Sequence, residues 1–79
     1  MKFSNKIKSF VSDKKLLTTN QVKKLYRDYP EIDDPGYPKT LVFSSPDKNE
    51  NTILQMEIGG KTYFVVSSPV TGHDVWYRL

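Results

Sequence analysis

The chain has 79 residues, no cysteine, one histidine and a formal net charge of +3. This length fits a single domain, residues 1–79, and leaves little volume for an internal substrate pocket. The absence of cysteine excludes disulfides, thiol nucleophiles and cysteine-ligated metal sites, and it favours a reducing compartment.

The apolar residues form no run as long as a signal-peptide core or a membrane span, so we expect a soluble, cytoplasmic protein that does not use a membrane. The charge is unevenly distributed. Residues 1–27 hold eight basic side chains and one acidic, whereas residues 28–57 hold two basic and seven acidic. A charge dipole of this kind steers charged partners.

Two helices are predicted first. Apolar residues at 3, 7, 10 and 11 share one helical face, which predicts a helix at about 4–14 with Ser4 as its cap. Thr18 and Gln21 form a capping box, with Leu17 and Val22 as a hydrophobic staple, and predict a second helix at about 18–29 that ends before proline. Because few residues separate the helices, we expect them to be packed neighbours.

The second half of the chain has the pattern of strands. Residues 30–39 are a proline-rich loop with a turn at 34–36, and strands are predicted at about 40–45, 52–58, 61–68 and 74–79, with a polar turn at 46–51. Gly59 and Gly60 give a tight hairpin turn. The expected fold class is α+β, with two N-terminal helices packed on an antiparallel meander of three to four strands.

The Gly59-Gly60 turn fixes a register that distributes the side chains between the two sheet faces. One face is strongly apolar, and the other carries Ile53, Phe64 and Val66 beside polar residues. If the helices cover only the first face, this second face is a candidate binding surface. The alternative is that the helices straddle the sheet, or that the 30–39 loop covers the patch.

Aromatic residues near the end of the chain add to this candidate surface. Trp76 and Tyr77 point to opposite faces of a strand, so we expect at least one of them to be exposed. Tryptophan and tyrosine are common in binding hot spots, although burial in the core is the alternative for most of the aromatic rings.

No motif indicates catalysis, a metal or a cofactor. Gly60-Lys61-Thr62 resembles the end of a phosphate-binding loop, but a strand follows it where such a loop opens a helix. His73 and Asp74, with Ser67 or Ser68 as the nominal nucleophile, could form a catalytic triad, but the sequence shows no recognisable oxyanion site. His73 is therefore interpreted as a histidine of a surface loop. The acidic side chains in the 30–39 loop lack the alternation of a calcium loop and are interpreted as a solvated turn.

A basic stripe, Lys23, Lys24 and Arg27, lies opposite the apolar face of the second helix. It fits an ordinary solvated helix face, a nucleic-acid surface or a surface for an acidic protein. A helix-turn-helix interpretation lacks a third helix and a glycine in the turn.

Non-enzymatic binding is therefore the predicted function. We expect a small protein-binding domain, of the kind that inhibits or regulates a larger protein, with a nucleic-acid-binding regulator using the basic helical face as the alternative. No cofactor is expected. The candidate partner-binding residues are Lys23, Lys24, Arg27, Ile53, Phe64, Val66, Trp76 and Tyr77.

Overall fold

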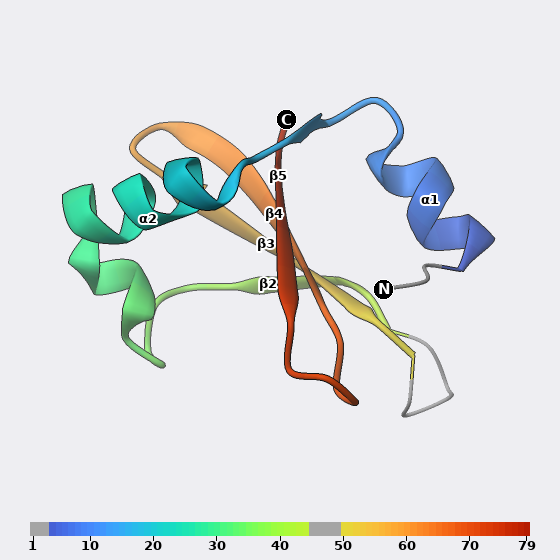
Figure 1. Ribbon diagram of the computed structural model, residues 1–79. Helices are drawn as coiled ribbons and strands as arrows, with labels where there is room; N and C mark the ends of the chain where they lie inside the picture. The colour runs from blue at the N-terminus through green and yellow to red at the C-terminus, as the bar shows by residue number, and fades with distance from the viewer. Residues whose placement is uncertain (1–3, 45–49) are drawn as a thin grey trace.

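A computed structural model describes residues 4–44 and 50–79 of the chain. The predicted α+β class is confirmed, with both α-helices preceding the four strands of the meander (Figure 1). The elements in chain order are α1 (Asn5–Val11), β1 (Lys15–Leu16), α2 (Thr19–Asp28), the 3₁₀ helix η1 (Pro30–Asp33), β2 (Thr40–Phe43), β3 (Thr52–Ile58), β4 (Lys61–Ser67) and β5 (Asp74–Arg78).

The sheet has five antiparallel strands in the order β1-β5-β4-β3-β2. Strands β2 to β5 form the predicted meander. The sheet has five strands rather than the predicted three to four because β1 also pairs with β5 at the edge. Gly59 and Gly60 have φ angles of 58° and 78° and form the predicted turn between β3 and β4. The predicted register from Ile58 opposite Lys61 to Ile53 opposite Val66 is confirmed.

Each α-helix begins at the predicted cap. The Ile7 amide donates to the Ser4 hydroxyl at 3.4 Å, and in α2 the Gln21 amide donates to Thr18 while the Thr18 amide donates to the Gln21 side chain. Helix α1 ends at Val11, earlier than predicted, because the chain turns there and enters β1. Three predictions touch residues outside the described ranges. These are residue 3 of the apolar pattern that predicts the first helix, residue 45 of the first predicted strand, and residues 46–49 of the predicted polar turn.

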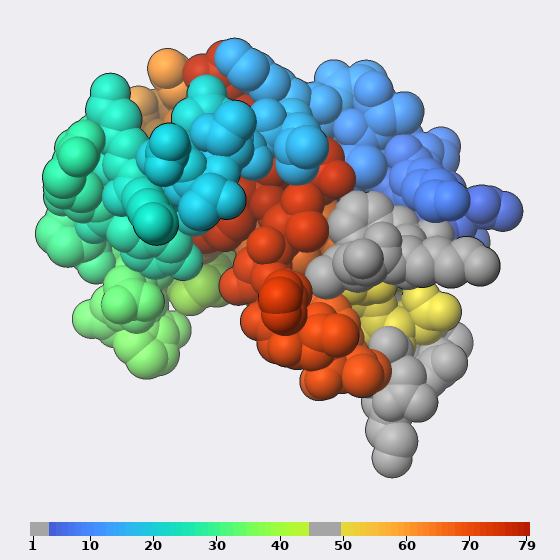
Figure 2. All heavy atoms as spheres, viewed as in Figure 1, coloured from blue at the N-terminus to red at the C-terminus, as the bar shows by residue number. Residues whose placement is uncertain are grey.

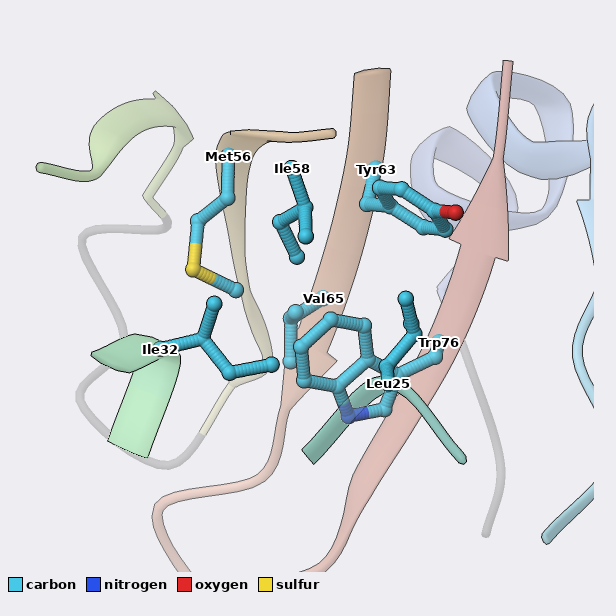
Figure 3. Close-up of a cluster of buried hydrophobic side chains, with 7 residues drawn as sticks. All are labelled: Leu25, Ile32, Met56, Ile58, Tyr63, Val65 and Trp76. Atoms are coloured by element: carbon cyan, nitrogen blue, oxygen red, sulfur yellow. The ribbon is translucent and has the colours of Figure 1, made fainter. Parts of the chain in front are cut away.

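The two α-helices lie on opposite faces of the sheet (Figure 1). The α2 face is the side on which α2 and η1 pack, and Figure 3 shows its core. Ile32 of η1 and Leu25 of α2 lie against the strand residues Met56, Ile58, Tyr63, Val65 and Trp76. The expectation of packed neighbouring helices is therefore wrong.

The α1 face is the other side of the sheet, and it is the face predicted to be partly bare. Helix α1 covers it through Ile7, which is 0% exposed, and through Phe10, whose ring lies edge-on to Phe64 at 5.1 Å between centroids. The helices straddle the sheet because β1 carries the chain around its edge, where the Leu17 amide donates to the Trp76 carbonyl at 3.0 Å.

Candidate functional site

The five apolar residues predicted to bind a partner lie in the core. Ile53, Phe64, Val66, Trp76 and Tyr77 are each at most 9% exposed. The expectation that Trp76 or Tyr77 is exposed is wrong, because both sheet faces are covered.

The covering side chains explain the burial of the two rings. Tyr26 of α2 lies edge-on to Trp76, with 5.8 Å between ring centroids, and Tyr77 belongs to the cluster that packs under α1. An apolar docking surface formed by these rings is therefore not available in this fold.

The predicted basic stripe on α2 is exposed, but the structure divides it. Lys24 lines a groove between α2 and the sheet, whereas Lys23 lines a separate hollow beside Tyr26. Arg27 is 74% exposed at its side chain and lies 3.7 Å from the Asp28 carboxylate. Of these three residues, Lys24 is therefore the one that lines the groove with further basic residues.

The basic groove is the strongest candidate site. It has a volume of about 360 Å³ and lies between α2 and the part of the α2 face near the β3–β4 hairpin. Its basic residues, one from each of four elements, are Lys15 of β1, Lys24 of α2, Lys61 of β4 and Arg78 of β5.

Strand register explains why these cations meet. Arg78 is paired with Lys15 on one side and with Tyr63 on the other, so these three side chains lie in one row across the α2 face. Lys61 precedes Tyr63 by two residues in β4 and therefore projects from the same face. Helix α2 supplies Lys24 as the facing wall.

The base of the groove is part of the hydrophobic core. Leu25, Ile58 and Tyr63 line it and are buried, and they also belong to the core of the α2 face (Figure 3). At the hairpin, the Tyr29 ring lies directly against Gly59, and both residues line the groove. The folded sheet therefore sets the backbone positions of the three strand residues that carry the cations, Lys15, Lys61 and Arg78.

The groove carries an excess of unpaired positive charge. Within the described ranges, none of its four basic side chains has an ion pair, and Asp28 is the one carboxylate in its lining. Lys14, by contrast, is neutralised elsewhere, because its ammonium contacts Asp13 at 3.0 Å and lies 4.0 Å from the centre of the Phe10 ring. Like charges gathered in a concave surface raise the local potential and attract anions.

Sequence reasoning missed Lys15, Lys61 and Arg78 as members of one site. The predicted hairpin register pairs Lys61 with Ile58 and therefore places both on the same sheet face. The missing signal was β1, because its pairing with β5 brings Lys15 beside Arg78.

The other motifs have local structural roles. The Gly60-Lys61-Thr62 segment forms a hairpin, and the Asp34 carboxylate accepts a hydrogen bond from the Gly36 amide in the predicted turn. In the loop before β5, the Ser68 amide donates to the His73 carbonyl at 3.0 Å. Across residues 4–44 and 50–79, no group of three or more His, Asp or Glu side chains is placed to hold a metal ion.

Within those same ranges, neither α-helix has the length and apolar character required to cross a membrane. No protein-family model, curated protein sequence or solved structure matches this chain.

Proposed function

We propose that this chain is a small non-enzymatic binding domain that docks on a larger protein. In the complex, the basic groove receives an acidic group of that partner. The observation that carries this proposal is the convergence of four cations on one concave surface, none of them ion-paired to another of the described residues. Such a surface gains favourable charge interactions when an anion enters it. A cytoplasmic location and a role in inhibition or regulation belong to the same proposal.

A mixed-charge protein suits the surroundings of the groove better than a uniformly charged polymer. Asp28 lines the groove, and the acidic residues of η1, Glu31 and Asp33, follow directly along the chain. A continuous phosphate backbone that crosses α2 would be repelled by these carboxylates. A protein partner can instead place complementary residues opposite both signs of charge.

A double charge reversal tests the proposal. Affinity-tagged protein is used to recover partners, and each partner is then measured with purified Lys24→Glu/Lys61→Glu protein. We expect a loss of at least about tenfold in affinity. The matched control is Lys6→Glu/Lys8→Glu, which makes the same change in net charge on exposed positions of α1. Equal affinity of the two double variants for every recovered partner would contradict the proposal.

Nucleic-acid binding is the second candidate function, because Lys23, Lys24 and Arg27 are all exposed on α2. The basic residues of α1 do not extend this surface, since α1 lies on the opposite sheet face and occupies a separate part of the surface in Figure 2. This candidate predicts DNA or RNA affinity that falls steeply with salt and is lost when the three residues are replaced by glutamate. Unchanged binding in that triple variant would remove it.

A further inference from the structure

We propose that the acidic group received by the basic groove is a phosphorylated side chain of the partner protein. This inference rests on the proposed function and names the chemistry of the group that the groove recognises. The arrangement of the four basic side chains suits one compact, multiply charged group better than an extended chain of single charges.

The four cations come from four different elements and reach the groove from two sides, the sheet and α2. Lys15, Arg78 and Lys61 project from the sheet, while Lys24 projects from α2. A carboxylate carries one charge and two oxygens. A phosphate monoester carries a charge of roughly −1.5 to −2 at pH 7 and three acceptor oxygens, which can be contacted from several directions at once.

Arg78 is the best-placed member for this chemistry. Its backbone is held in β5 between Lys15 on one side and Tyr63 on the other, and the residue is half-buried, whereas the three lysines are exposed. A guanidinium presents paired donors that match two phosphate oxygens, whereas lysines supply point charges.

The size of the groove favours a phosphate attached to a side chain over a free ion. A volume of about 360 Å³ lies at the lower end of the range for small-molecule sites and exceeds the space that a phosphate group alone occupies. The side chains of Leu17 and Tyr29, which also line the groove and are only partly buried, offer an apolar surface to the carbon atoms that carry the phosphate.

The test uses capped glycine peptides with a central phosphoserine, glutamate or serine, titrated into ¹⁵N-labelled full-length protein at constant ionic strength. We expect saturable amide shifts at Lys24, Lys61 and Arg78 with the phosphopeptide, and at least about tenfold weaker binding of the glutamate peptide. Arg78→Lys keeps the charge but removes the guanidinium, and should reduce this preference. Lys8→Glu, on α1, should leave it unchanged.

The remaining outcomes separate this inference from the proposed function. Equal affinity for the phosphoserine and glutamate peptides would overturn the inference while leaving an acidic partner in place. Inorganic phosphate binding as tightly as the phosphopeptide, or a single-stranded oligonucleotide binding more tightly at physiological salt, would also overturn it. If no peptide binds, the inference fails. The proposed function would still stand if the affinity for the partner protein depends on Lys24 and Lys61.

Discussion

The phenol ring of Tyr29 rests on Gly59, so that the end of α2 touches the turn between β3 and β4. A Cβ atom built on Gly59 would collide with the Tyr29 hydroxyl and would lie 2.8 Å from its Cζ atom. The absence of a side chain at this position therefore allows the helix to approach the hairpin, and it shapes one end of the basic groove.

This contact predicts different costs for alanine at the two hairpin glycines. Gly60→Ala introduces only the strain of a positive φ, because no atom lies within 4 Å of its built Cβ, and should cost about 1 kcal/mol. Gly59→Ala adds the displacement of Tyr29 and should cost at least about 1 kcal/mol more. Urea unfolding of both variants measures the difference, and equal losses would contradict the close approach.

The capping box of α2 predicts a second pair of variants. Thr18→Ala removes the hydroxyl that accepts the Gln21 amide and should lower the free energy of unfolding by about 1 kcal/mol. Thr19→Ala, one residue along in the first turn, removes no cap and should change stability little. Chemical denaturation compares the two, and a Thr19→Ala loss as large as that of Thr18→Ala would argue against the cap.

Burial of Ile7 predicts that α1 is firmly attached to its sheet face. Ile7→Ala leaves a cavity against Ile53 and Val66 and should cost about 2–5 kcal/mol. Lys8→Ala, at an exposed position on the same helix, serves as the control and should stay within about 0.5 kcal/mol of the parent. A small effect of Ile7→Ala in thermal unfolding would show that α1 contributes little to the fold.

Two tyrosines predict a loss of stability in alkali. Burial raises the pKa of Tyr26, and the nearby carboxylates of Asp33 and Asp74 raise it further. Burial alone raises the pKa of Tyr77. The folded state therefore holds these protons more tightly than the unfolded state, in which the ordinary pKa is 10.0. Their contribution is complete below about pH 10 and is lost as the pH rises through the folded pKa values.

The measurement is urea unfolding of the parent and of Tyr26→Phe between pH 8 and 11. The variant lacks one of the two phenols whose pKa is raised, so its stability should fall less steeply above pH 10. The comparison between the two proteins cancels the titration of the lysines, which they share. Parallel pH profiles would contradict the raised Tyr26 pKa.

Much of the fold could be predicted from local signals. The Gly59-Gly60 turn determines the pairing of β3 with β4 residue by residue, since a two-residue turn with positive φ at both positions permits one register. Thr18 and Gln21 likewise fix the start of α2 within a few residues of sequence. These features depend on local backbone geometry, which residues adjacent in sequence determine.

The placement of the helices could not be predicted in this way. An apolar helical face shows that α1 is covered by something, but the sheet has two apolar faces, and the pattern in α1 is the same for either. Which face α1 covers depends on β1. This strand has only two residues, too few to show the alternation of a strand, and it is held by pairing with β5, which is distant in sequence.

The candidate site was predictable only in part for the same reason. Lys24 followed from the helical period of α2, whereas Lys15, Lys61 and Arg78 lie on three strands and meet only in the folded sheet. The apolar candidates were misplaced because hydrophobic residues on a second face indicate a binding surface only when no element covers that face.

The ladder between β1 and β5 joins segments near the two ends of the described chain. The groove is therefore complete only after this long-range pairing has formed. The hairpins of the meander connect neighbours in sequence and can close early, whereas Lys15 can meet Arg78 only after a large loop has closed. An anion bound by both residues stabilises the closed loop, so ligand affinity and the lifetime of this ladder are thermodynamically linked. The Leu17 amide, which donates to Trp76 across the same edge, should then exchange with solvent more slowly when the groove is occupied.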